Sequence, residues 1–133
     1  MANLYTVTRS SAFNVTDNDK FLKLVDEIGH DYPELQSWRS YIDPNKWIIG
    51  GEFENEDILE IFDGNGILDK LQELLPKDEA VMLMTIGHEK LRYIYSDVYM
   101  ITKNDIQYID LADEAILLAR RMIGDNNKTL IFD

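Results

Sequence analysis

A chain of 133 residues, 45% of them hydrophobic and 11% aromatic, has enough apolar material for the core of one domain. It contains no cysteine, which excludes disulfides, thiolate metal sites and a cysteine nucleophile and favours a cytoplasmic location. Asp and Glu number 25 against 13 Lys and Arg, and the resulting net charge of -12 disfavours nucleic acid and anionic membrane surfaces as direct partners. No apolar run reaches the roughly 18 residues of a membrane span.

The N-terminal part of the chain predicts a strand and then a helix. Alternating apolar residues indicate a strand over Leu4–Val15, with an interruption at Arg9–Ser11. Thr16 is a suitable N-cap for the helix and Gly29 a suitable C-cap. The predicted core-facing stripe of this helix consists of Phe21, Leu24, Val25 and Ile28.

A β-hairpin is expected next. Alternating residues from Leu35 to Tyr41 predict a short strand, and Lys46–Phe53 predicts a second one. The intervening Asp43–Lys46 sequence has the composition of a turn. The paired glycines Gly50 and Gly51 indicate a bulge or a close approach of two backbones.

One interrupted helix and four strands are predicted in the second half. Asn55 can cap a helix that Asp63–Gly66 breaks or kinks, and its apolar stripe resumes at Ile67 and ends before Pro76. The continuous apolar run Ala80–Ile86 is typical of a strand covered on both faces. Three further strands are expected at Leu91–Tyr95, Val98–Thr102 and Ile106–Leu111.

A last helix is predicted over Ala112–Ile123, with Gly124 as its stop and the apolar residues Leu130–Phe132 as a possible edge strand. Runs of strands interspersed with helices favour an α+β fold. We therefore expect a single domain over residues 1–133, with a mostly antiparallel sheet of about five to seven strands and three helices packed on it.

The segment around Asp63, Asn65 and Asp69 resembles a calcium-binding EF-hand loop, with Gly66 at the sharp turn. The two positions that matter most for calcium binding lack their usual ligands, because Ile61 replaces the first carboxylate and Gln72 replaces the bidentate glutamate. A glycine-rich break between helices explains the segment better, and we expect no bound metal and no other cofactor.

The densest group of ionisable residue types is His88, Glu89, Lys90 and Arg92, after the predicted buried strand. A histidine with an orienting carboxylate is a general-base pair, and the two cations could hold an anion. Neighbouring strand residues point to opposite faces, however, so His88 and Glu89 should not meet. A hairpin turn accounts for the same composition.

Aromatic and acidic residues supply the candidates for partner binding. Tyr and Trp dominate the energetics of protein interfaces, and a dense acidic segment suits a basic partner. The aromatic candidates are Trp38, Trp47, Tyr93 and Tyr95. The acidic candidates are Glu52, Glu54, Glu56, Asp57 and Glu60. A core role for the aromatic residues and a solvated helix face for the acidic ones are the alternatives.

Two stretches resemble those of small acidic proteins carried by bacterial conjugative elements and prophages. They are Ser10–Asp17, followed by Phe21, and the block Val81–Tyr93, in which Gly-x-Glu-Lys-Leu-Arg-Tyr is the more specific part. The resemblance implies a mobile-element setting and no particular activity. The segment Asp31–Glu54 lies outside the likeness.

The sequence thus favours a non-enzymatic interaction protein that binds a protein partner, preferably a basic one, through its aromatic or acidic residues. In a mobile element, that partner could be a defence nuclease or another nucleic-acid-binding protein. The alternative is a small enzyme or ligand-binding domain that uses His88, Glu89, Lys90 and Arg92. No catalytic residue is assigned on sequence grounds, and the oligomeric state is left open.

Overall fold

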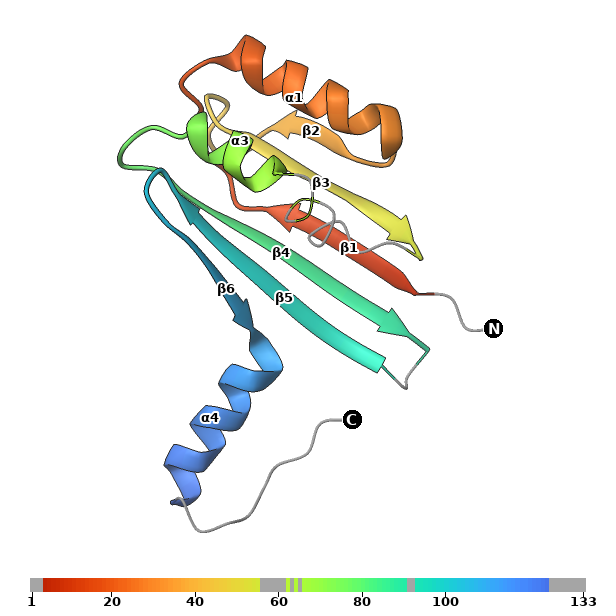
Figure 1. Ribbon diagram of the computed structural model, residues 1–133, viewed down its shortest axis with the longest axis vertical. Helices are drawn as coiled ribbons and strands as arrows, with labels where there is room; N and C mark the ends of the chain where they lie inside the picture. Colours follow the sequence, from red (N-terminus) through yellow and green to blue (C-terminus); the bar gives the residue numbers. More distant parts are fainter. Residues whose placement is uncertain (1–3, 56–61, 63, 65, 91–92, 125–133) are drawn as a thin grey trace.

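The computed structural model describes residues 4–55, 62, 64, 66–90 and 93–124 (Figure 1). The described residues form one six-stranded sheet and three helices, as the predicted α+β class requires. The strands are β1 (Tyr5–Ser10), β2 (Gln36–Arg39), β3 (Trp47–Glu54), β4 (Ala80–Glu89), β5 (Tyr93–Thr102) and β6 (Ile106–Asp110). The helices are α1 (Asn18–Asp31), α3 (Ile67–Glu73) and α4 (Leu111–Ile123).

The sheet has the strand order β2-β3-β1-β4-β5-β6, and each of its neighbouring pairs is antiparallel. The β2–β3 hairpin and the β4–β5–β6 meander lie on the two sides of β1, which pairs with both β3 and β4. The N-terminal strand thereby joins two locally formed units into one sheet.

Helices α1 and α3 cover one face of this sheet, which we call the core face. Their apolar stripes meet inward-pointing residues of β3, β4 and β5 in one cluster. The helical part of the cluster comprises Phe21, Leu24, Ile28, Ile67, Leu68 and Leu71. The strand part includes Ile49, Phe53, Val81, Leu83 and Ile101. This burial of apolar area is the main stabilising term of the fold.

Small polar residues occupy the core face at the middle of the sheet. The hydroxyls of Thr8 and Thr85 are 2.7 Å apart in a buried hydrogen bond, and the Ser10 hydroxyl accepts the Ile49 N–H at 3.0 Å. Among the described residues, every buried side-chain nitrogen or oxygen has a hydrogen-bond partner. The polar atoms on β1 are therefore satisfied, which removes the free-energy cost of burying them.

Local hydrogen bonds set the ends of two helices. Asp17, one residue after the predicted Thr16, caps α1 by accepting the Lys20 N–H at 3.1 Å. The helix then continues through Gly29 to Asp31, so the predicted stop at Gly29 is wrong. At α4, Asp110 accepts the Asp113 N–H at 3.0 Å, and Gly124 at φ 77 ends the helix as predicted.

Strand β4 departs from the prediction that it is covered on both faces. Buried and less buried residues alternate along it, and Met82 and Ile86 remain exposed on the side opposite α1 and α3. The apolar run indicated double coverage because both sets of side chains are hydrophobic. No described helix packs over the second set, and this leaves an apolar face open.

Two strands predicted separately are one. β5 runs without a break through Ser96-Asp97 because each of its residues pairs with β4 over the full length of the hairpin. The turn-like composition at these two residues is overridden by cross-strand pairing. The tail containing Leu130–Phe132 lies outside the described residues.

The prediction of a close backbone approach at Gly50 and Gly51 is confirmed. A Cβ atom on Gly50 would lie 2.5 Å from the Thr8 carbonyl oxygen, and one on Gly51 would lie 2.5 Å from the Glu34 carbonyl oxygen. Both distances are far below van der Waals contact. Glycine is required here by the space between strands and not by the backbone dihedral angle.

Replacing Gly50 by alanine should lower the free energy of unfolding by about 1–3 kcal/mol, because the new methyl group displaces the backbone of the paired strand. Gly29→Ala is the matched control. Nothing lies within 4 Å of a Cβ at Gly29, so the helix should gain about 0.5–1 kcal/mol from alanine. Urea unfolding of the three proteins measures both changes, and equal stability of Gly50→Ala and wild type would contradict the packing described above.

Candidate interaction surface on the open face of the sheet

The face of the sheet opposite α1 and α3, which we call the open face, carries a band of uncovered apolar side chains. Strand register places Val7 of β1 next to Ile86 of β4, and these side chains are 52% and 53% exposed. Tyr5, Trp38, Met82 and Ile94 are the other large apolar residues exposed on this face. A contiguous apolar patch of this kind is typical of a protein-binding surface.

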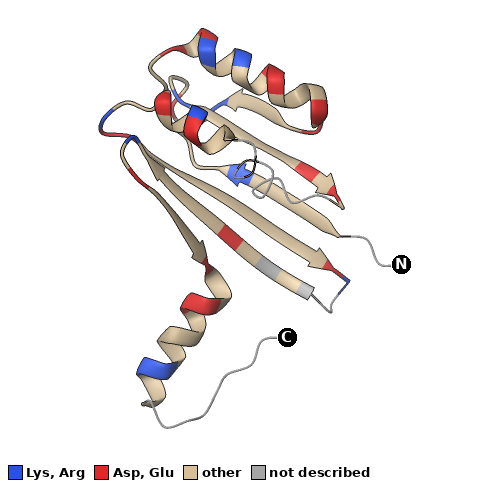
Figure 2. Ribbon diagram, in the orientation of Figure 1, with Lys and Arg blue, Asp and Glu red and all other residues tan. Residues whose placement is uncertain are grey.

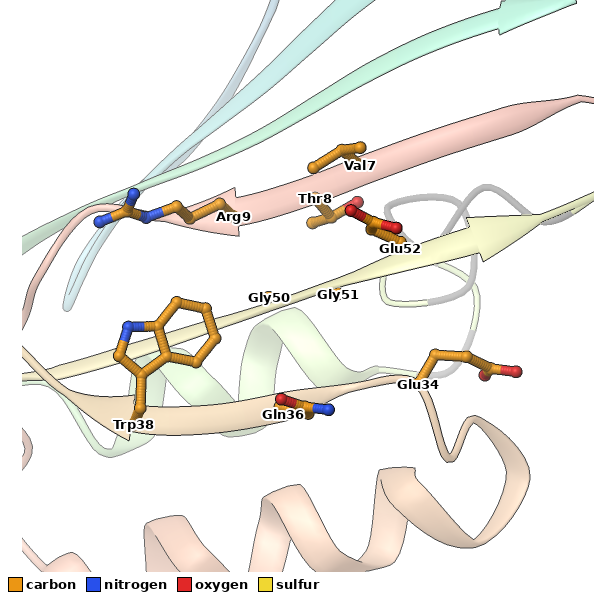
Figure 3. Close-up of a pocket in the computed structure, with 9 residues that line it drawn as sticks. All are labelled: Val7, Thr8, Arg9, Glu34, Gln36, Trp38, Gly50, Gly51 and Glu52. Atoms are coloured by element: carbon orange, nitrogen blue, oxygen red, sulfur yellow. The ribbon is translucent and has the colours of Figure 1, made fainter.

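A hollow of about 490 Å³ crosses β1, β3 and β2 at one end of the open face (Figure 3). Gly50 and Gly51 of β3 form its floor, and Gly50, which pairs with Arg9 and Gln36, presents no side chain to the open face. The residues around this floor are Val7, Thr8, Arg9, Glu34, Gln36, Trp38 and Glu52. Gly50, which allows the β1 backbone to approach closely, thus also leaves this part of the open face without a side chain.

The hollow is polarised along its length. Figure 3 shows the Trp38 ring and the Arg9 guanidinium at one end and the Glu34 and Glu52 carboxylates toward the other. A bound peptide would contact an aromatic ring and a cation at the Trp38 end and two carboxylates at the Glu34 end. This arrangement suits a peptide segment with an apolar anchor and a nearby basic residue.

A second hollow of about 430 Å³ adjoins the first and shares Val7 and Arg9 with it. Met82, Met84 and Ile86 of β4 form its apolar side. Methionine side chains are unbranched and polarisable, so they can adapt to partners of different shape. The two hollows together extend across the middle of the open face.

The two tryptophans proposed as partner-binding residues have different environments. Trp38 is 39% exposed and borders the first hollow, whereas Trp47 is only 8% exposed. The Trp47 indole N–H donates to Asn18 Oδ1 at 2.9 Å, and the Arg39 guanidinium lies 3.8 Å from the ring centroid. Trp47 is therefore a core residue that fixes α1 against β3, and its inclusion among the binding candidates is corrected.

The acidic candidates are only partly described. Glu52 borders the first hollow, and Glu54 lies two residues further along β3. Glu56, Asp57 and Glu60 lie outside the described residues. Elsewhere, acidic positions are spread over α1, β5 and α4 (Figure 2).

The tyrosine candidates Tyr93 and Tyr95 are in β5, paired with Glu89 and Gly87, and their side chains lie outside the described part of the molecule. A different tyrosine pair is well defined on β5 and β6. The rings of Tyr99 and Tyr108 are 5.2 Å apart, and the Tyr108 hydroxyl donates to Asp97 Oδ1 at 2.6 Å. This hydrogen bond to a carboxylate is the main reason why the pKa of Tyr108 lies well above its ordinary value.

The described residues among those considered for catalysis, His88, Glu89 and Lys90, do not converge. The His88 ring stacks on Tyr5 of the neighbouring strand, with ring centroids 5.6 Å apart. Glu89 follows His88 on β4 and so points to the other face of the sheet, as predicted. Lys90 takes a positive φ of 52 in the hairpin turn, and Arg92 lies outside the described residues.

The weak calcium candidate cannot be assembled from the described residues. Asp63 and Asn65 lie outside them, and Asp69 is in the first turn of α3. Within the described parts of the chain, no group of three or more His, Cys, Asp or Glu side chains is arranged to hold a metal ion.

Sequence reasoning missed Val7, Arg9 and the methionines of β4 as surface residues. The signal for the methionines was present in the unbroken apolar run of β4, which supplies hydrophobic side chains to both faces. Which face the helices leave open is a property of the assembled sheet. Pattern alone could therefore not separate core from surface here.

Comparisons of the chain with protein-family models, with curated proteins and with solved structures gave no match. Within the described residues, no helix has the length and hydrophobicity needed to cross a lipid bilayer. The function is therefore inferred from the geometry of the open face itself.

The different exposure of the two tryptophans predicts a difference in fluorescence quenching. Trp38→Phe should leave an emission that acrylamide quenches weakly, because only the buried Trp47 remains. Trp47→Phe should leave an emission that is quenched several-fold more strongly. Circular dichroism checks that both variants are folded, and equal quenching in two folded variants would contradict the assignment of Trp38 to the surface.

Proposed function

We propose that this chain is a non-enzymatic protein-binding domain and that its partner docks on the open face of the sheet, across the hollow bordered by Trp38 and Glu52. The observation that carries the proposal is the uncovered apolar band on β1 and β4. Large apolar side chains that remain in water at the centre of a sheet lower the free energy of the complex when a partner covers them.

A basic protein is the partner that this surface favours. The net charge of -12 attracts cationic surfaces at long range, and Glu34 and Glu52 offer carboxylates inside the hollow. Trp38 supplies the kind of aromatic side chain that dominates binding free energy at interfaces. The same charge repels phosphate groups, so contact with a nucleic-acid-binding protein is favoured over contact with nucleic acid.

The setting that we propose is the cytoplasm of a bacterium that carries a mobile element. It is supported by the absence of cysteine and by the resemblance of Ser10–Asp17 and Val81–Tyr93 to proteins of such elements. A defence nuclease or a host nucleic-acid-binding protein has the basic surface that this role requires. The enzyme alternative has no comparable support, because His88 and Glu89 point to opposite faces of the sheet.

Capture from a nuclease-treated bacterial lysate tests the proposal. The wild-type chain should retain a basic protein at about 0.1 M salt and release it near 1 M, where the Debye length falls to about 3 Å. Trp38→Ala should weaken binding of that protein at least about 10-fold, because an aromatic anchor is lost. Glu52→Lys should also weaken binding, and the loss should be larger at low salt than at high salt.

Tyr41→Ala is the matched control, because Tyr41 is a 99% exposed aromatic residue outside the strands of the sheet. It should bind as wild type does. Retention of the same proteins by wild type and Trp38→Ala, with no dependence on salt, would show that the open face is not the binding surface.

A further inference from the structure

Helix α4 has an apolar surface that no other described part of the chain buries. It contacts β5 and β6, yet none of its residues is buried, and it extends away from the body of the sheet (Figure 1). The partly buried residues Ala112, Ile116 and Ala119 form one stripe along the helix. A second stripe, which we call the α4 seam, is exposed and consists of Leu111, Ala115, Leu118 and Met122.

The α4 seam has the spacing of a helix-pairing surface. Its members follow one another at intervals of four, three and four residues, which keeps them on one line of an α-helix and matches the pattern of paired helices. Leu118 is 51% exposed and Met122 is 76% exposed. An isolated surface helix does not need such a line of large side chains in water.

The charges beside the seam identify its occupant. Glu114 and Arg121 lie on the same flank, one near each end of α4, and both are exposed. When two copies of α4 pack antiparallel, Leu118 of each copy meets Ala115 of the other and Glu114 meets Arg121. A parallel pair would instead place Glu114 opposite Ala119, where no charge is available.

We propose that α4 mediates self-association, with a second copy of this chain as the occupant of the α4 seam in an antiparallel, two-fold symmetric helix pair. The surface is self-complementary, as a two-fold interface requires, because each copy supplies both the acidic and the basic member of every ion pair. This inference does not depend on the proposed function, since Trp38 and the two hollows lie on the open face of the sheet and not on α4.

The size of the seam sets the expected strength. A helix of 13 residues is about 20 Å long and buries less than the ~800 Å² per partner of a standard stable interface. We therefore expect a dissociation constant on the order of micromolar. The dimer should form and dissociate over an accessible concentration range.

Sedimentation of the full chain from about 1 to about 100 µM tests the proposal. The wild type should shift from monomer to dimer with concentration, and Leu118→Glu should raise the dissociation constant at least about 30-fold. Leu117→Glu is the matched control, because Leu117 is 47% exposed on the polar side of the same helix. It should dimerise as wild type does.

Charge reversal tests the orientation. Glu114→Arg and Arg121→Glu should each weaken the dimer, and the double variant should restore it because both ion pairs re-form with exchanged signs. Restored helix stability cannot explain such a rescue, since both changes oppose the helix dipole. The double variant Asp113→Arg/Arg120→Glu makes the same exchange on the opposite side of α4 and should leave dimerisation unchanged.

Three results would overturn the proposal. One is a wild-type chain that stays monomeric at every concentration. Another is a dimer that Leu118→Glu and Leu117→Glu affect equally. The third is a monomeric wild type that becomes dimeric when residues 125–133 are deleted, which would assign the seam to the chain's own C-terminal tail. The Trp38→Ala variant should still form the dimer. The self-association proposal and the partner-binding proposal can therefore fail independently of each other.

Discussion

The constraint on which the rest of this structure depends is a sheet with helices on one face and apolar residues on both. Helices α1 and α3 cover the core face, and their removal of apolar area from water stabilises the fold. Strand β4 supplies Val81 and Leu83 to that core and, by alternation, Met82 and Ile86 to the other side. The second set has no cover within the described residues, and this is the origin of the candidate binding surface.

The open face and the α4 seam are distinct in place and in chemistry. The open face combines the Trp38 ring with a cation and two carboxylates over a glycine floor, which suits recognition of a different protein. The α4 seam combines large aliphatic side chains with opposite charges at the two ends of one helix, which suits recognition of its own copy. A dimer through α4 would carry two open faces, and two weak contacts with a repetitive or dimeric partner would then reinforce one another.

Sequence patterns predicted the elements better than they predicted the site. The stop of α4 at Gly124, the β2–β3 hairpin and the glycine approach follow from local stereochemistry, which a sequence displays directly. Trp38 and Trp47 show why surface assignment is harder. Both are tryptophans at a hairpin, but α1 packs over one of them and not over the other, and only the assembled structure decides which.

By itself the sequence determined the α+β class, the absence of disulfide chemistry, the acidic charge and most helix and strand positions, because composition and periodicity act through local and average properties. Tertiary structure decided that β5 is one long strand, that β1 joins the two halves of the sheet, and that Val7, Arg9 and the β4 methionines face water. These outcomes depend on pairing and coverage between segments far apart in the chain. A one-dimensional pattern that is hydrophobic on both faces does not specify which face will be covered.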